Sequence, residues 1–197
     1  MTDQPLTDSV LDRLFLEART HNAWQDRPVS EDVLRQLYSL TSMGPTSFNG
    51  SPMRLVFVCS DEGKARLCEA LLPSNVAKTM QAPVCAIVAH DMSFWEAFPT
   101  LSPHKDVRGY FRDNAALTEE TAFRNSSMQG AYLIMAARAL GLDCGPMSGF
   151  DRSRVDELFF GGTSWRSNFL CNLGYGDPSA LYPRNPRLAY ETACRLA

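Results

Sequence analysis

Four short segments concentrate the polar and glycine residues that could perform chemistry. They read A-R-T-H-N-A-W (18–24), G-P-T-S-F-N (44–49), N-V-A-K (75–78) and C-G-P-M-S-G-F-D (144–151). Asn75 and Lys78 are three positions apart and would therefore share one face of a helix. Gly145 and Gly149 would let the backbone approach a ligand closely. Taken singly, each segment is more typical of a turn or a helix end, so the signal lies in their order and spacing.

The sequence lacks the motifs of several common sites. It contains no G-x-G-x-x-G, no P-loop and no G-x-S-x-G. Its histidines, His21, His90 and His104, are far apart and have no ligand spacing, so no metal site is expected.

Composition and charge are those of an ordinary globular protein. Hydrophobic residues make up 45% and charged residues 21% of the 197 residues, and the formal net charge is -3. This charge gives no overall attraction to nucleic acid or anionic lipid, so neither is an expected partner. The first residues resemble no signal peptide, and no run of about 18 apolar residues exists. The six cysteines show no C-x-x-C spacing. Together with the missing signal peptide and apolar run, this leads us to expect a reduced, cytoplasmic protein without a membrane span.

Hydrophobic spacing predicts a single α+β domain, residues 1–197, in which helices outweigh strands. Apolar runs predict strands at 54–59, 84–89 and 169–175. Helical spacing and breakers predict helices at 8–20, 61–72, 75–81 and 151–160. A further helix is capped by Ser30 and stops before Gly44. The strand at 84–89 is apolar throughout and should be buried on both faces, whereas 176–197 reads as an extended arm.

A long helix is predicted at about 117–140, closed by Gly141. From Met128 to Leu140 it is almost entirely apolar or small. A helix that is apolar all round must be covered on all sides, which favours a second subunit. Arg124, Asn125 and Ser126 interrupt the apolar pattern, either as a surface or dimer patch or as part of a binding pocket.

The segment 91–115 reads as irregular and is rich in aromatic residues. A loop of this length in a compact domain more often has a function than serves only as a connection. It could wall a substrate pocket, with Arg108 or Arg112 attracting a small carboxylate, or it could form a dimer arm. The sequence leaves both interpretations open.

Taken together, the four segments resemble the nitroreductase family. Members carry an arginine-rich opening motif, an A-P-S-S-x-N-like turn, an Asn-x-x-Lys pair, a long interfacial helix ending L-G-L, a P-x-x-G-F-D turn and a basic C-terminal arm. The chain has the corresponding segments in that order, ending with A-R-A-L-G-L-D, G-P-M-S-G-F-D and P-R-L. It is most similar to the short members that resemble malonic semialdehyde reductases of bacterial uracil degradation.

The resemblance implies an intertwined homodimer that holds FMN between its subunits. The expected fold is a central, mostly antiparallel sheet flanked by helices, with a long interfacial helix and an exchanged C-terminal arm. NADH or NADPH would pass hydride to the flavin, and an acceptor would then take it from the same face in a ping-pong reaction. Such a reaction needs no catalytic side chain and no metal.

The resemblance also assigns site residues. The phosphate and ribityl end of FMN would meet Arg19, Thr20, His21 and Asn22, with Arg187 pairing to the phosphate. The partner subunit would supply Pro45, Thr46, Ser47 and Asn49 at the dimethylbenzene side. The pyrimidine edge would meet Asn75 and Lys78, where the lysine charge would stabilise reduced flavin. The face near N5 would be covered by Pro146, Met147, Ser148 and Gly149, with a backbone N–H as donor.

Some positions depart from the family pattern. Ala18, Asn22 and Asn185 stand where many members carry a basic residue, which implies a weaker hold on the phosphate. The expected acceptor is malonic semialdehyde, which would be reduced to 3-hydroxypropionate. The alternatives are a broad nitroaromatic or quinone reductase, and a flavin-binding module without turnover.

Overall fold

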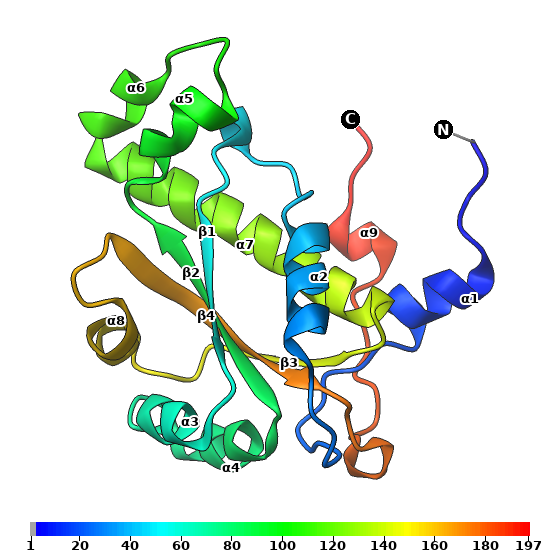
Figure 1. Ribbon diagram of the computed structural model, residues 1–197. Coiled ribbons are helices and arrows are strands. Elements are labelled where there is room, and N and C mark those ends of the chain that lie inside the picture. Colours follow the sequence, from blue (N-terminus) through cyan, green and yellow to red (C-terminus); the bar gives the residue numbers. More distant parts are fainter. Residues whose placement is uncertain (1–2) are drawn as a thin grey trace.

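The computed structural model describes residues 3–197 and places four strands in one sheet. The strands are β1 (Met53–Val58), β2 (Val84–Asp91), β3 (Asp143–Met147) and β4 (Trp165–Gly174). They stand in the order β1-β2-β4-β3, and every neighbouring pair is antiparallel (Figure 1). The predicted α+β class with a mostly antiparallel sheet is confirmed.

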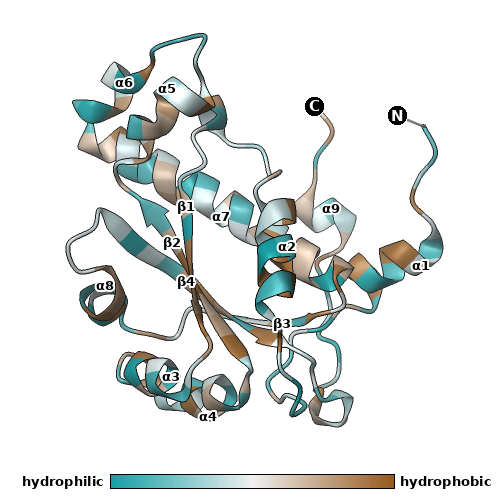
Figure 2. Cartoon of the chain, viewed as in Figure 1, coloured by the Kyte–Doolittle hydropathy of each residue, from teal (hydrophilic) through white to brown (hydrophobic). Residues whose placement is uncertain are grey.

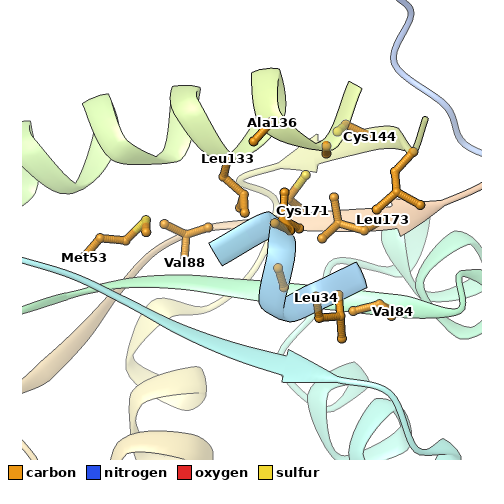
Figure 3. Packing of buried hydrophobic residues seen from close by; sticks show 13 residues of the cluster. Leu34, Met53, Val84, Val88, Leu133, Ala136, Cys144, Cys171 and Leu173 are labelled. Carbon is orange, nitrogen blue, oxygen red and sulfur yellow. The ribbon is translucent and has the colours of Figure 1, made fainter. Parts of the chain in front are cut away.

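Helices cover both faces of this sheet. α2 (Glu31–Thr41) and α7 (Ala115–Ala139) pack on one face, and α3 (Asp61–Cys68), α4 (Pro73–Gln81) and α8 (Arg152–Phe160) lie on the other (Figure 1). Between the sheet and the first helical layer, Leu34, Val88 and Leu133 meet in one hydrophobic cluster (Figure 3). The domain therefore has three layers, with the sheet in the middle.

β2 is buried along its whole length, as its apolar sequence predicts. Val84, Ala86 and Val88 join the cluster under α2 and α7. The alternate residues Cys85, Ile87 and Ala89 join the cluster on the α3 and α8 side. A central strand covered on both faces has no position for a solvated side chain, which explains the unbroken apolar run.

The predicted helix ends are confirmed by their caps. The side chain of Ser30 accepts a hydrogen bond from Val33 N, and that of Asp151 accepts one from Arg154 N (3.1 Å). Gly141 closes α7 with a φ of 85°, in the left-handed region that favours glycine.

The first helix is shorter than predicted. α1 (Asp8–Leu11) continues as one π-helical turn, Asp12–Leu16, and helical geometry ends there rather than at residue 20. The apolar side chains at its end are poorly covered in residues 3–197, since Phe15 and Leu16 are 55% and 67% exposed. Without tertiary burial, apolar spacing alone does not extend a helix.

β3 is a strand that the sequence pattern does not predict. It contains Gly145 and Pro146, and both residue types are depleted in strands. Its position explains them, because β3 lies at an edge of the sheet and pairs with β4 alone. Proline is tolerated at an edge, where a missing N–H need not break a ladder.

The segment 91–115 is not irregular, which corrects the sequence prediction. It forms a 3-10 helix, Phe94–Ala97, followed by α5 (Phe98–Leu101) and α6 (Arg108–Arg112). These short helices enclose a core of their own in which Phe94, Phe98 and Phe111 are almost fully buried. Helices of one turn have too few residues to show a hydrophobic period.

The C-terminal residues form the predicted extended arm, interrupted by a 3-10 turn, Pro178–Ala180, and by α9 (Tyr190–Ala193). Hydrophobic colour in Figure 2 gathers on the centre of the sheet and also on α1.

Within residues 3–197, no helix is long and apolar enough to cross a membrane. All six cysteines are free thiols.

Candidate functional site

Three of the four polar segments meet beside β3 and α4. Thr20 forms a parallel bridge with Cys144, and His21 N donates to Cys144 O (3.0 Å). Lys78 Nζ donates to Asn22 Oδ1 (3.3 Å), which ties α4 to the opening segment. The turn after β3 is joined to α4 by Asn75, so segments far apart in sequence share one site.

The turn at Ser148 and Gly149 presents backbone donors. Gly149 O accepts hydrogen bonds from Leu72 N (3.0 Å) and Asn75 Nδ2 (2.8 Å), which fixes the turn. A Cβ at Gly149 would lie 2.7 Å from Asn75 Nδ2, so glycine is needed for this approach. The N–H groups of Ser148 and Gly149 have no acceptor among the hydrogen bonds of the described residues. They are thus available to a ligand.

Lys78 supplies the positive charge of this group. Its side chain is half-buried on α4, and burial lowers the pKa of its ammonium from the ordinary value. Its hydrogen-bond partner is the neutral amide of Asn22, and no carboxylate in residues 3–197 forms an ion pair with it. Lys78 can therefore offer its charge to an electron-rich ligand.

Unsatisfied polar atoms gather on the inner side of the same site. His21 Nδ1, Trp24 Nε1 and Asn172 Oδ1 are buried without a hydrogen-bond partner. A Cβ at Gly145 would lie 2.6 Å from His21 O and 3.2 Å from the Trp24 ring. Buried polar atoms are almost always satisfied by protein, by water or by a ligand. The close packing at Gly145 shows that the backbone of β3 lies directly against His21 and Trp24, so glycine is needed here as well.

His21 and Met147 turn their side chains inward. His21 is only 6% exposed, and its Nε2 lies 3.4 Å from Asp143 Oδ1. Met147 is buried in the cluster on the α3 side, where its sulfur accepts from Thr79 Oγ1 (3.9 Å). For these two predicted site residues, the backbone rather than the side chain faces the site. Pro146 and Ser148, in contrast, are exposed.

Arginines line a neighbouring cavity of about 210 Å³ between the opening segment and the C-terminal arm. Its cationic side chains are Arg19, Arg138, Arg184 and Arg187. Arg19 donates to Tyr182 O, Arg138 to Leu14 O (2.8 Å), Arg184 to Leu16 O (2.5 Å), and Arg187 to Asn185 O (2.9 Å). Within the described chain, none of the four has a carboxylate within ion-pair distance.

This carboxylate-free cluster suits a phosphate, which arginine binds through two parallel hydrogen bonds. Sequence reasoning named Arg19 and Arg187 but missed Arg138 and Arg184. The signal for Arg138 was a lone cation within the apolar end of the long helix. Such a residue is costly there unless it has a partner or a function.

The segment 45–49 lies elsewhere, near α5 and α6 of the segment 94–111, which we call the insert. Ser47 N donates to Asn125 Oδ1 (2.8 Å), and Asn49 Nδ2 donates to Leu101 O in α5 (2.8 Å). Asn125 is buried, which excludes a solvated surface patch for this residue, and its side chain anchors the turn, a role that the sequence did not suggest. α4 precedes β2 and α5 follows it, so the turn and the other segments lie at opposite ends of that strand (Figure 1). Over the eight residues of β2 this is roughly 25 Å.

The two arginines considered for a carboxylate differ. Arg108 is paired with Asp106 through two contacts of 2.8 and 3.0 Å, and this ion pair lowers the pKa of the Asp106 carboxyl to about 2. Arg112 is exposed at the end of α6 and has no ion-pair partner in residues 3–197. Only Arg112 keeps its charge free for an acid.

Comparison with known proteins identifies the family of this chain. The model of the nitroreductase family matches residues 16–175. A Burkholderia lata protein named NADH dehydrogenase/NAD(P)H nitroreductase is 62% identical over 191 residues, covering 97% of this chain and 98% of that protein. The chain therefore belongs to the nitroreductase family.

Solved structures confirm the fold. A nitroreductase of Bacillus subtilis has a TM-score of 0.86 at 17% identity, covering 97% of this chain and 100% of that chain. A nitroreductase of Exiguobacterium sibiricum, solved in complex with FMN, has a TM-score of 0.84 at 21% identity and covers both chains completely. The expected nitroreductase-like fold, a sheet flanked by helices, is thus confirmed.

Proposed function

We propose that the protein is an FMN-dependent NAD(P)H oxidoreductase that works by ping-pong hydride transfer. The observation that carries the proposal is the convergence of Lys78, Asn75 and the Ser148–Gly149 turn beside arginines that lack carboxylate partners. The FMN bound to the Exiguobacterium relative and the name of the Burkholderia relative support it.

Each group has a role toward the cofactor. Bound FMN would supply the hydride chemistry, accepting from NADH or NADPH and donating to the acceptor. Arg19 and Arg187, with Arg138 and Arg184 beside them, would hold the phosphate. Thr20, His21 and Asn22 would lie along the ribityl chain, with His21 acting through its backbone.

The ring would be met by groups from α4 and the β3 turn. Asn75 has its amide oxygen free to accept from the pyrimidine edge, because only Nδ2 is used by Gly149 O. Lys78 would place its charge beside the same edge. The free N–H of Ser148 or Gly149 would donate to N5, while Pro146 and the backbone of Met147 would border the ring face.

A homodimer would complete the site. Pro45, Thr46, Ser47 and Asn49 would come from the partner, since within one chain they lie at the far end of β2. A partner subunit would have a surface to occupy at the outer edge of β1, which pairs with no other strand. This edge borders a groove of about 710 Å³ along α2, lined in part by Leu34, Tyr38 and Phe57. The C-terminal arm, with Leu188 75% exposed, is the segment that could be exchanged into a partner.

Two acceptor classes compete. Malonic semialdehyde is a small carboxylate, and Arg112 is the insert arginine free to attract it. The name of the Burkholderia relative favours a nitro compound, and a quinone would use the same hydride chemistry. Neither acceptor would require a side-chain nucleophile.

The visible spectrum of the purified protein tests the flavin proposal. We expect flavin absorption, bleached by NADH or NADPH without oxygen and restored by an acceptor. A protein that gains no flavin on incubation with FMN would refute the flavin assignment. Bound flavin that neither nucleotide reduces would instead support a binding module without turnover.

Steady-state kinetics then separate the acceptors. NADPH and NADH oxidation should be measured with malonic semialdehyde and with a nitrofuran, and kcat/KM compared. A higher value for malonic semialdehyde would support the aldehyde reductase, and a higher value for the nitrofuran the broad nitroreductase.

Replacing Arg138 tests the phosphate site. Arg138→Met should weaken FMN binding by about tenfold or more, as expected for a lost charge-assisted hydrogen bond. Riboflavin, which lacks the phosphate, should bind the variant and the wild type equally. The binding constants can be read from flavin fluorescence quenching, with Arg66→Met, at an exposed position on α3, as the matched control. Equal losses for FMN and riboflavin would mean that Arg138 supports the fold rather than the phosphate.

A further inference from the structure

The turn between α2 and β1 holds a strained backbone. Phe48, Asn49 and Ser51 have φ values of 51°, 56° and 41°, and in residues 3–197 they are the non-glycine residues with positive φ. For a bulky residue such as phenylalanine this conformation is a genuine outlier. It persists only where the surroundings enforce it, and such residues cluster at ligand sites.

The insert at 94–111 enforces the conformation from one side. The Phe48 ring meets Phe98 and Phe111 edge-on, at centroid distances of 6.3 Å and interplanar angles of 75° and 78°. Next to it, Asn49 Nδ2 donates to Leu101 O (2.8 Å). A Cβ at Gly50 would already lie 3.0 Å from the Phe94 ring, so the turn fits tightly against the aromatic cluster.

The body of the domain fixes the turn from the other side. Arg54 Nη1 donates to Ser51 O (3.0 Å), and its Nη2 pairs with Asp91 Oδ2 (2.6 Å). Ser51 N donates to Thr46 Oγ1 (3.1 Å), which closes the turn on itself. Phe48 is therefore held in one orientation by contacts on both sides.

Burial of the Phe48 ring does not explain why this strained backbone conformation is maintained. Phe94, Phe98 and Phe111 are 1–3% exposed, whereas Phe48 remains 43% exposed. Part of its ring packs against the cluster, and the remainder is exposed. A cavity of about 520 Å³ lies beside the same turn, with Pro45, Asn49 and Leu101 among its lining residues, and the Phe48 side chain stands outside this cavity.

We propose that Phe48 is a specificity-determining residue whose outward ring forms one wall of the acceptor site. This rests on the proposed function, in which residues 45–49 border the flavin of the partner subunit. An aromatic wall gains most from a flat, conjugated acceptor that can stack on it, and least from a short aliphatic one. Phe48 thus raises the preference for nitroaromatic or quinone acceptors over a small aliphatic aldehyde.

Two substitutions separate the ring from the backbone. Phe48→Gly removes the ring and tolerates positive φ, while Phe48→Leu keeps the strain and the bulk but removes the aromatic face. In both variants the KM for a nitrofuran should rise about fivefold, which corresponds to about 1 kcal/mol of lost stacking. The kcat/KM for malonic semialdehyde should change less than twofold. Phe159→Ala, which removes a half-buried ring on α8 across the sheet, is the matched control and should leave the ratio unchanged.

Other results would overturn the proposal. A parallel change with both acceptors would show that Phe48 only supports the turn. A weaker dimer in sedimentation, with the acceptor ratio unchanged, would assign the ring to subunit contact instead. Failure of NADH and NADPH to reduce wild-type flavin would refute the proposed function itself, and is distinguishable because it precedes any acceptor measurement.

Discussion

Lys78 and His90 are two residues whose surroundings constrain their charge in different ways. Lys78 keeps an ammonium in a half-buried position with only a neutral amide as partner. His90, on β2, is fully buried, and neither ring nitrogen has a hydrogen-bond partner. The surroundings of Lys78 leave its positive charge available to a ligand, whereas those of His90 disfavour the charged imidazolium.

Replacing Lys78 should lower the flavin reduction potential. Lys78→Met removes the positive charge that would stabilise reduced flavin, and we expect a fall on the order of 30 mV, equal to about 1.4 kcal/mol for two electrons. The measurement is dye-coupled photoreduction, with Lys105→Met, at an exposed position in the insert, as control. An unchanged potential would remove Lys78 from the ring edge. Because burial lowers the pKa of Lys78, the wild-type potential should also begin to lose this support at a lower alkaline pH than a free lysine would give.

His90 should make the fold sensitive to acid. Burial and the nearby Arg152 and Arg166 lower the pKa of His90 from 6.5 to about 4. Between these values the unfolded chain binds a proton that the folded chain does not, so stability falls as the pH drops from about 6.5 to about 4. The loss is on the order of 3 kcal/mol. In His90→Leu, melting curves across this range should show a clearly smaller decrease, and an identical decrease would assign the acid sensitivity to other groups.

At the scale of elements, sequence reasoning succeeded where an element has a period or a cap. α2, α7, α8, β2 and β4 were predicted because they carry apolar faces, buried runs or capping residues. β3 was missed because its composition, with Gly145 and Pro146, serves close approach at an edge rather than strand propensity. α5 and α6 were missed because single-turn helices have no readable period.

α4 illustrates how an element is fixed by a partner outside it. Lys64 on α3 is 6% exposed, and its Nζ donates to Met80 O (3.2 Å) and Ala82 O (3.1 Å) at the end of α4. A cation at a helix C-terminus satisfies free carbonyls and the helix dipole together.

Removing this cap should destabilise the domain. We expect Lys64→Met to lower the free energy of unfolding by about 1–3 kcal/mol, since buried carbonyls lose their donor. Urea unfolding followed by circular dichroism gives the value, with the exposed Lys105→Met as reference. A loss below about 0.5 kcal/mol, typical of surface changes, would show that water replaces the ammonium.

At the scale of the whole molecule, the apolar helix 117–140 pointed to a partner. In the single chain, α7 leaves Phe123, Met128 and Tyr132 each 42–43% exposed along its outer side. The sequence pattern alone could not predict the distance between the two halves of the candidate site, the 45–49 turn and the group around α4. That distance follows from β2, which separates α4 from the insert, and strand length is a property of the assembled sheet.

Disrupting this outer side of α7 should weaken the dimer and FMN binding together. Met128→Glu places a charge on the apolar face, and we expect a dimer dissociation constant at least tenfold higher in sedimentation equilibrium. FMN affinity should fall with it and recover at higher protein concentration, because binding and association are linked. Ala65→Glu, on α3 across the sheet, is the control. Full FMN affinity in a monomeric variant would contradict a shared site.

The separation of the 45–49 turn from α4 has a genetic consequence. If each site takes its turn from one chain and its lysine from the other, then two damaged copies can repair each other. Co-expression of a chain altered at Asn49 with one altered at Lys78 would yield mixed dimers in which one site carries both defects and the other carries none. Two alleles that are inactive alone would then restore activity in the same cell.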